Sequence, residues 1–274
     1  MTNLGFIGFG SMAKMLVSTL LNSAPITQSQ IFITRQDKSK LNEVTNLWPE
    51  ANSVETISEV VKSSEYIFLC VKPLQFKNIL EEIKPYMNES KTLVSISGTI
   101  TLDNIGRFLN CKIVKIMPTI ISEVKEGITL ICHNEKVSVK DMEFLEGLLS
   151  NISLVKHIEE KNFGFISELT SCGPGLISAV FRNFANAAEK HTSSFRSKEI
   201  EEMLLYTLYG TAKLMLDKKM NFEDVISRVA TSGGITEEGV KVINKGIPPV
   251  LNEMFDKTLE KRKVISKKAT AMME

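Results

Sequence analysis

The sequence predicts an α/β fold in which a doubly wound sheet of seven or eight strands is followed by an all-helical C-terminal domain. From residue 1 to about residue 156, short apolar runs alternate with amphipathic segments, the pattern of strand and helix units in a parallel sheet. After about residue 158 the strand signal stops and only helical periodicity continues. We therefore expect two domains, residues 1–157 and 158–274. This division suits a chain of 274 residues, since a domain typically has about 100 to 200.

The N-terminal segment combines a strand, a glycine turn and a helix. The apolar residues 4–7 end at Gly8 and Gly10, and an amphipathic stretch follows. Gly8, Gly10 and Ala13 fit the spacing G-x-G-x-x-G/A, in which a tight turn, a close approach of pyrophosphate and close helix packing each require a small residue. The phosphates would lie on free N–H groups at the helix N-terminus. We predict a Rossmann domain that binds a dinucleotide, the alternative being glycines that only shape a turn.

The later strands are predicted from apolar runs of four to six residues. Residues 66–71 are continuously apolar, as in strands of a parallel sheet that helices cover on both faces. Between the strands, the clearest helical patterns are residues 74–87 and 140–150. The remaining strands are expected at residues 30–34, 92–96, 112–117, 128–131 and 154–157.

The end of the second strand indicates which cofactor is bound. It reads Ile33-Thr34-Arg35. An acidic side chain at this place binds the ribose 2′-hydroxyl of NAD, whereas an Arg accommodates the 2′-phosphate of NADP. Thr34 and Arg35 supply a hydroxyl and a cation, so we expect NADPH. Asp37 keeps NAD as an alternative, and Arg35 could also be an ordinary exposed residue after a strand.

Three further turns follow predicted strands: Val71-Lys72-Pro73, Ser95-Ile96-Ser97-Gly98 and Met117-Pro118-Thr119. Each could be only the end of a strand. All three, however, lie at the carboxyl edge of the sheet, where ligands bind in open α/β folds, and a cofactor lying across that edge explains them better. The predicted cofactor-binding residues are Gly8, Gly10, Ser11, Met12, Thr34, Arg35, Val71, Lys72, Pro73, Ser97, Gly98 and Pro118.

In the C-terminal half we expect helices at residues 174–190, 197–217, 221–229, 237–244 and 249–267. The first has apolar side chains on more than one face, which indicates burial on several sides. A homo-oligomer formed through this domain would supply that burial. The basic residues near the end of the chain are interpreted as a solvated helix end rather than a nucleic-acid site, and they are Lys261, Arg262, Lys263, Lys267 and Lys268.

A second glycine segment, Thr231-Ser232-Gly233-Gly234-Ile235-Thr236, precedes a predicted helix. Glycines and hydroxyls at a helix start can hold a small carboxylate through backbone N–H groups and the helix dipole. The alternative is a simple helix N-cap by Thr231, Ser232 or Thr236.

Composition and charge exclude several classes of protein. A formal net charge of +1 gives no electrostatic reason to expect nucleic acid or a membrane as partner, and no run approaches the roughly 20 apolar residues of a membrane helix. The four cysteines stand singly, without zinc spacing, so we predict free thiols and no metal. Because the chain enters a strand at once, we expect no signal peptide and a cytoplasmic protein.

The sequence resembles the pyrroline-5-carboxylate reductase family, whose members reduce a cyclic imine to proline with NAD(P)H. The resemblance implies a Rossmann domain, a helical dimerisation domain and an active site between them. Thr236 would lie near the imine nitrogen, and Ser232, Gly233 and Gly234 would hold the substrate carboxylate. The matching segments run in family order along nearly the whole chain: Gly8-Phe9-Gly10-Ser11-Met12, Val71-Lys72-Pro73, Met117-Pro118, Glu126-Gly127, Gly173-Pro174, and Ser232-Gly233-Gly234-Ile235-Thr236 with Gly239.

The chain also departs from the family pattern. Many members read Met-Pro-Asn-Thr-Pro where this chain has Met-Pro-Thr-Ile-Ile at 117–121, Ser-Pro-Gly-Gly-x-Thr where it has Thr-Ser-Gly-Gly-Ile-Thr at 231–236, and Ser-Gly-Pro-Ala where it has Cys-Gly-Pro-Gly at 172–175. These changes resemble a divergent branch, a late-competence protein of spore-forming bacteria. Two hypotheses follow: a reductase of 1-pyrroline-5-carboxylate, or a non-catalytic dinucleotide-binding protein with a regulatory role. A third, a β-hydroxyacid dehydrogenase, would need a catalytic Lys in the helical domain, and no such motif is present.

Overall fold

The computed structural model describes residues 2–273. The chain forms two compact units, which we call the first unit (Met1–Pro174 with Leu259–Glu274) and the second unit (Gly175–Thr258). These units are defined by packing, and the division into domains at residue 157 stays a prediction.

The first unit contains one sheet of eight strands in the order β3-β2-β1-β4-β5-β6-β7-β8. Strands β1 to β6 are parallel in the order 3-2-1-4-5-6, which is that of a Rossmann fold. The predicted fold class is confirmed. The strands are β1 (Leu4–Ile7), β2 (Ile31–Thr34), β3 (Asn52–Ser53), β4 (Tyr66–Leu69), β5 (Thr92–Ser95), β6 (Lys112–Met117), β7 (Gly127–His133) and β8 (Ser153–His157).

One edge of the sheet is not parallel to the rest. Strand β7 pairs antiparallel with β6, with Met117 opposite Leu130, and β8 runs parallel to β7. The connecting residues 118–126 are fewer than the dozen or more that a parallel crossover needs. The short connection therefore reverses the chain.

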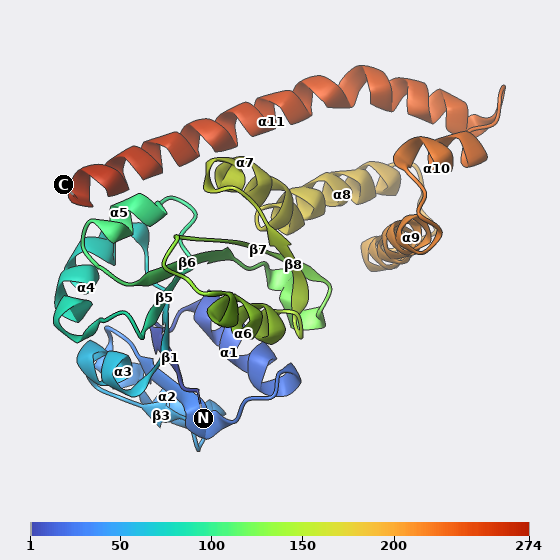
Figure 1. The fold of residues 1–274 in the computed structure, drawn as a ribbon. Coiled ribbons are helices and arrows are strands. Elements are labelled where there is room, and N and C mark those ends of the chain that lie inside the picture. Colours follow the sequence, from blue (N-terminus) through green and yellow to red (C-terminus); the bar gives the residue numbers. More distant parts are fainter. Residues whose placement is uncertain (1, 274) are drawn as a thin grey trace. The chain divides into compact units, whose positions relative to one another are not determined.

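Helices cover both faces of the sheet (Figure 1). The core has a separate hydrophobic cluster on each face, and the members of each cluster show which helices cover that face. Leu16, Val44 and Leu145 pack in the first cluster, on the face of α1, α2 and α6. Val60 and Leu80 pack in the second cluster, on the face of α3, α4 and α5. These helices are α1 (Ser11–Ser23), α2 (Asn42–Leu47), α3 (Ile57–Ser63), α4 (Phe76–Ile83), α5 (Leu102–Gly106) and α6 (Val139–Leu149).

Capping residues set where several helices begin. The Thr56 hydroxyl accepts from the backbone N–H of Glu59, and the Glu59 carboxylate accepts from the backbone N–H of Thr56, at the start of α3. Ser138 and Asp141 make the same reciprocal pair at the start of α6. Each pair satisfies two backbone donors that the helix itself leaves free.

The remaining helices are α7 (Glu160–Thr170), α8 (Gly173–Glu189), α9 (Ser197–Lys218), α10 (Phe222–Val229) and α11 (Ile235–Met273). The expected pair of helices at 237–244 and 249–267 is wrong, because α11 continues through Pro248 and Pro249. Each proline deprives the carbonyl four residues earlier, at Asn244 and Lys245, of its helical donor. Both of these residues are exposed, so water can take the place of the missing N–H groups.

The second unit has large apolar side chains on its surface. On α9, Leu205 is 63% exposed and Tyr209 is 65% exposed, and their spacing of four residues places them on one face of the helix. An exposed apolar surface of this kind indicates a contact with another protein. Other exposed apolar side chains of the second unit are Ile177, Val180, Phe184, Met203, Tyr206, Phe222, Val242, Ile243 and Val250. Among residues 2–273, no helix combines the length and the apolar character that crossing a bilayer requires.

Candidate functional site

Gly8 makes the turn between β1 and α1. Its φ is +93°, a conformation that side chains rarely adopt, and its N–H donates to the Thr34 carbonyl at 2.9 Å. A Cβ at this position would lie 2.6 Å from the Cys70 carbonyl oxygen. Glycine is therefore required both by the backbone conformation and by the close packing of this turn against the end of β4.

The N-terminus of α1 is open. Gly10 is its N-cap and offers no side chain to the free N–H groups of the first turn, which also contains no acidic residue. Nothing lies within 4 Å of the position that a Cβ of Gly10 would take. Ala13, the third small residue of the motif, is buried in the core. An anion can approach the partial positive charge of this helix end, so the turn fits a pyrophosphate.

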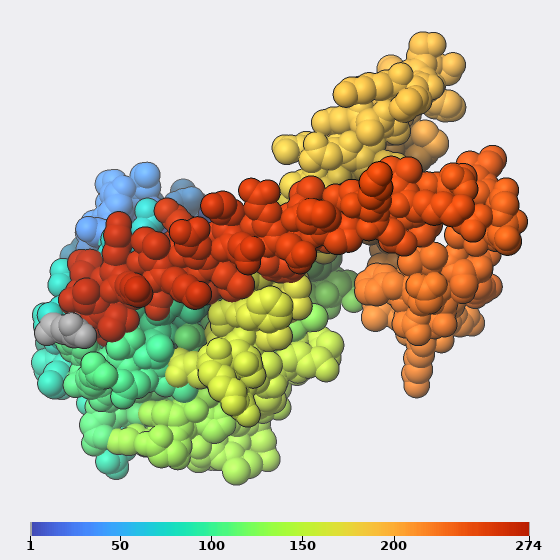
Figure 2. Space-filling view, turned by 90° about the horizontal axis from the view of Figure 1, so that it is seen from above, coloured from blue at the N-terminus to red at the C-terminus, as the bar shows by residue number. Residues whose placement is uncertain are grey.

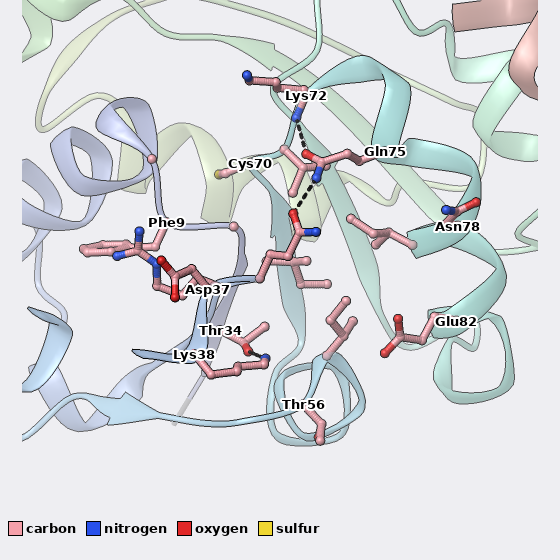
Figure 3. A pocket seen from close by; sticks show the side chains of 18 of the residues that line it. Phe9, Thr34, Asp37, Lys38, Thr56, Cys70, Lys72, Gln75, Asn78 and Glu82 are labelled. Carbon is pink, nitrogen blue, oxygen red and sulfur yellow. Dashed lines mark hydrogen bonds between the residues drawn. The ribbon is translucent and has the colours of Figure 1, made fainter. Parts of the chain in front are cut away.

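A pocket of about 1090 Å³ lies at the carboxyl edge of β1, β2 and β4. Figure 3 shows Phe9, Thr34 and Lys38 on one side of it and Asn78 and Glu82 on the other. Its volume is slightly above the usual range of about 300 to 1,000 Å³ for small-molecule sites. The predicted residues that line it are Gly8, Gly10, Thr34, Arg35, Val71 and Lys72.

Arg35 is positioned at the end of β2 by two neighbours. Its Nη1 donates to Glu43 Oε2 at 2.7 Å, and its guanidinium carbon lies 6.0 Å from the centre of the Phe9 ring. The side chain is 17% exposed. The cation is thus held in one place rather than left free in solvent.

Thr34 is buried, and its hydroxyl accepts from Lys38 Nζ at 3.1 Å. Lys38 also donates to the backbone oxygen of Glu55. Lys38 is a residue of this site that the strand-and-turn pattern does not predict. The signal available was the run of basic residues after the strand, Arg-Gln-Asp-Lys-Ser-Lys at 35–40.

A second hollow of about 640 Å³ is lined by Ser11, Lys14, Arg35, Lys40 and Glu43, together with Phe9, Gly10 and Asn46. Three of these side chains are cationic and one is anionic. Such a group of donors fits a phosphate that carries two negative charges. Lys14 and Lys40 are two further residues of this site that the sequence motifs do not predict.

Asp37 was the residue that kept NAD as an alternative. The hydrogen bond that Ser39 donates, and then the charge of Lys40, lower the pKa of the Asp37 carboxyl. Ser39 Oγ lies 2.6 Å from Asp37 Oδ1, and Lys40 Nζ lies 3.6 Å from Oδ2. The carboxylate lines the pocket and already has these two local partners.

A chain of hydrogen bonds joins the turns after β2 and β4 (Figure 3). The backbone N–H of Lys72 donates to Gln75 Oε1 at 3.2 Å, and Gln75 Nε2 donates to Gln36 Oε1 at 2.9 Å. Pro73 begins the short 3-10 turn Pro73–Gln75. It is not among the residues that line the pocket.

Several other predicted residues also lie outside the lining of this pocket. Met12 packs against the first core cluster, and Pro118 is buried. The Ser97 hydroxyl accepts from the backbone N–H of Ile100 at 3.3 Å. A Cβ on Gly98 would lie 2.5 Å from the end of the Met117 side chain. Contact of these residues with a cofactor stays a prediction.

The predicted substrate loop lies in the second unit, at the start of α11. Thr236 and Ser232 are exposed, and Gly233 adopts a φ of +75°. The N–H of Gly233 donates to Glu237 Oε2 at 2.8 Å, and the N–H of Gly234 donates to the Thr231 carbonyl at 2.9 Å. Two of the N–H groups expected to hold a carboxylate therefore have partners within the loop.

Cys70 is the thiol that lines the first pocket. Burial raises the pKa of the Cys70 thiol to about 12, so this cysteine, which lines the pocket, is protonated at neutral pH and is a poor nucleophile. Within residues 2–273, no three His, Cys, Asp or Glu side chains are grouped so as to hold a metal ion.

The sheet order, the positive-φ glycine turn and the open helix end define a dinucleotide-binding protein of the Rossmann type. Two family models match the chain. One, described as "Pyrroline-5-carboxylate reductase dimerisation", matches residues 160–265. The other, described as "NADP oxidoreductase coenzyme F420-dependent", matches residues 3–98.

Similar proteins narrow the class to one family. Pyrroline-5-carboxylate reductase 3 of Bacillus subtilis (strain 168) is 35% identical over 267 residues, which are 97% of each chain. ComE operon protein 4 of the same organism is 26% identical over 258 residues, 93% of each chain. A pyrroline carboxylate reductase structure from Plasmodium falciparum, with NADP bound, superposes with a TM-score of 0.83 at 22% identity, covering 100% of this chain and 98% of that one. The chain belongs to the pyrroline-5-carboxylate reductase family.

Proposed function

We propose that this protein is an NADPH-dependent reductase that converts 1-pyrroline-5-carboxylate to L-proline. Membership of the family, at 35% identity to a named reductase along nearly the whole chain, supports the reaction. The choice of NADPH as the cofactor rests on one observation, the open N-terminus of α1 beside the cations at the end of β2. The structure described from Plasmodium falciparum has NADP bound, which agrees with this choice.

The cofactor would be held by groups of the first unit. Backbone N–H groups at Gly10 and Ser11 would bind the pyrophosphate, and Arg35, with Lys14 and Lys40, would bind the 2′-phosphate. NADPH, when bound, supplies the hydride. NADH stays an alternative cofactor, since the same glycine turn would bind its pyrophosphate.

The substrate would be held by the loop at the start of α11. Its carboxylate would take the place of the Glu237 carboxylate on the N–H of Gly233, which at present donates to that side chain. The Thr236 hydroxyl would hydrogen-bond the ring nitrogen and so orient the C=N bond for hydride transfer to carbon. The iminium would enter already protonated, so that no acidic side chain is needed as proton donor.

The proposal extends to assembly and setting. A homodimer or a larger homo-oligomer would cover the exposed apolar side chains of the second unit, with the imine as a small-molecule ligand. Proline biosynthesis is the proposed route and the cytoplasm the proposed compartment. All four cysteines are free thiols, which suits a reducing compartment.

A steady-state assay tests the proposal. The purified protein is given NADPH or NADH with pyrroline-5-carboxylate and a panel of other small cyclic imines, and oxidation of the nicotinamide is followed with and without imine. We expect the fastest imine-dependent oxidation with NADPH and pyrroline-5-carboxylate. If the protein binds NADPH but none of the imines in the panel causes its oxidation, the proposed reductase activity is contradicted and the regulatory alternative is favoured.

A further inference from the structure

The C-terminal end of α11 belongs to the first unit. Ala269 and Met273 are buried in the second core cluster, beside Leu80 and Ile105. Ser266 Oγ donates to the backbone carbonyl of Thr99 at 3.1 Å. In Figure 2 this end of the helix, in red, lies along the teal and green surface of the same unit. One of the basic residues interpreted as a solvated helix end, Arg262, is paired with a buried carboxylate of this unit, so the interpretation is wrong for that residue.

Arg262 is 19% exposed, and it is paired with Glu168 of α7, which is 2% exposed. Its Nε and Nη2 donate to Glu168 Oε1 at 2.9 and 2.6 Å. A carboxylate this deeply buried is strongly destabilising unless a cation accompanies it. The pair therefore fixes the guanidinium in one position.

Two glycines make room for the Arg262 side chain. A Cβ on Gly98 would lie 3.0 Å from Nη1 of Arg262, and a Cβ on Gly164 would lie 3.2 Å from its Cδ. Both distances are shorter than ordinary van der Waals contact. Neither glycine is among the described glycines with a positive φ. The backbone conformation therefore does not require glycine at these two positions, whereas the space taken by Arg262 does. The Arg262 side chain therefore lies next to α7 and to the turn after β5, in space that a side chain at either glycine would enter.

This turn, residues 97–99, which we call the β5 turn, lies where a cofactor is expected. Leu69 of β4 pairs with Ser95 of β5, so the β5 turn and the pocket-lining residues 70–72 leave neighbouring strands at the same edge of the sheet. That carboxyl edge is the ligand-binding edge of an open α/β sheet. The end of α11 meets the β5 turn at two places: Ser266 donates to the Thr99 carbonyl, and Arg262 lies where a Cβ on Gly98 would come within 3.0 Å of its Nη1.

We propose that Arg262 is a positioning residue, which, anchored on Glu168, holds the β5 turn in the conformation that cofactor binding needs. The cofactor half of this inference rests on the proposed function. The holding of the turn does not, because it is a property of the protein without ligand.

Three variants test the proposal. Arg262→Met/Glu168→Gln removes the pair without leaving a buried charge, and Arg262→Lys keeps the charge but loses the two-donor geometry. The matched control is Lys112→Met, which breaks another partly buried ion pair of the first unit, with Asp141 at 2.8 Å. Lys112 begins β6, at the opposite edge of the sheet from the β5 turn.

Two measurements are made on each full-length variant. Hydrogen exchange of the backbone amides of residues 97–100 is followed without ligand, and the NADPH dissociation constant is measured by fluorescence titration. For the double variant we expect faster exchange at these amides and an NADPH dissociation constant raised about 10-fold, with an intermediate effect for Arg262→Lys. Lys112→Met lowers the melting temperature and changes neither quantity.

Unchanged exchange in the double variant overturns the proposal, as does an equal change in Lys112→Met, because the effect would then follow general stability. Faster exchange with an unchanged NADPH dissociation constant overturns the cofactor half alone. A wild-type protein that binds no NADPH contradicts the proposed function, and with it the cofactor half, whereas exchange still decides whether Arg262 holds the turn.

Discussion

The guanidinium of Arg35 donates a 2.7 Å hydrogen bond to the carboxylate of Glu43, so the cation predicted to bind a 2′-phosphate already has an anionic partner. Lys14 lies 3.9 Å from the other oxygen of the same carboxylate. A phosphate entering here would gain from three cations, Arg35, Lys14 and Lys40, and be opposed by the one carboxylate. If the protein prefers NADPH, as proposed, this balance of charges would set the preference, and substitutions could shift it in either direction.

Arg35→Ala should weaken NADPH binding about 10 to 100-fold, because a charge-assisted hydrogen bond to the 2′-phosphate is lost. NADH, which has no 2′-phosphate, should be nearly unaffected. Dissociation constants of both cofactors, measured by titration, check this. Arg107→Ala is the matched control, since Arg107 is paired with Asp103 at the surface of α5. Equal losses for the two cofactors would exclude Arg35 as the residue that selects NADPH.

Glu43→Gln should act in the opposite direction. It removes the competing negative charge and frees Arg35, so NADPH should bind about 3-fold more tightly, the modest effect expected of an exposed ion pair. The gain should shrink as salt is added, because mobile ions screen exposed charges. A weaker affinity for NADPH in this variant would mean that Glu43 serves mainly to hold Arg35 in place.

Part of this site was predictable from sequence because its requirements are local. A positive φ at Gly8 and an open N-cap at Gly10 concern single residues, and the apolar runs that form β1 and β4 are continuous. The charged partners of the site are different. Glu43 belongs to α2, whose one buried residue is Val44. The sequence of this helix therefore has no apolar periodicity from which the helix could be predicted.

Other features follow only from tertiary structure. Strand β3 has the polar residues Asn52 and Ser53, and it is defined by pairing with β2 rather than by hydrophobicity. Glu168 and Arg262 are 94 residues apart in the chain, and each by itself looks like an ordinary charged residue on a helix. The two residues pair because of the place where α11 packs, and local sequence patterns do not predict that place.

Gly8→Ala should lower stability by at least about 1 to 3 kcal/mol, because the positive φ is strained for alanine and the new Cβ would meet the Cys70 carbonyl. Thermal unfolding and NADPH titration should both show the loss. Gly147→Ala is the control: this glycine lies inside α6 with open space around it. Alanine there should stabilise the helix by about 0.5 to 1 kcal/mol. Similar melting temperatures for the two variants would contradict the strained turn.

Assembly should depend on the apolar face of α9. Wild-type protein is expected to be a dimer or larger at micromolar concentration, and Leu205→Glu/Tyr209→Glu should shift it toward monomer, because carboxylates cannot be buried in an apolar contact without cost. Light scattering or sedimentation measures the mass. Lys140→Glu places a carboxylate on α6 of the first unit, outside the apolar surface of the second unit, and should leave the assembly intact. A monomeric wild-type protein would contradict the prediction.

The last prediction concerns catalysis at Thr236, which is exposed in the first turn of α11. If its hydroxyl hydrogen-bonds the ring nitrogen as hydride arrives, Thr236→Ala loses a contact that strengthens in the transition state, and turnover should fall about 100-fold or more. The melting temperature should hardly change, because an exposed hydroxyl contributes little to stability. NADPH binding should persist, because the glycine turn and Arg35 belong to the first unit.

The matched control is Thr211→Ala, which removes an exposed hydroxyl whose hydrogen bond, to the Thr207 carbonyl at 2.7 Å, lies within α9. Steady-state rates with pyrroline-5-carboxylate, melting temperatures and NADPH titrations are compared for the wild type and both variants. Loss of turnover in Thr236→Ala alone, with the other two quantities preserved, assigns the hydroxyl to the reaction. Equal turnover in all three proteins would mean that Thr236 has no catalytic role and is only part of the helix start. The proposed binding of the substrate carboxylate by Gly233 and Gly234 would then need a separate test.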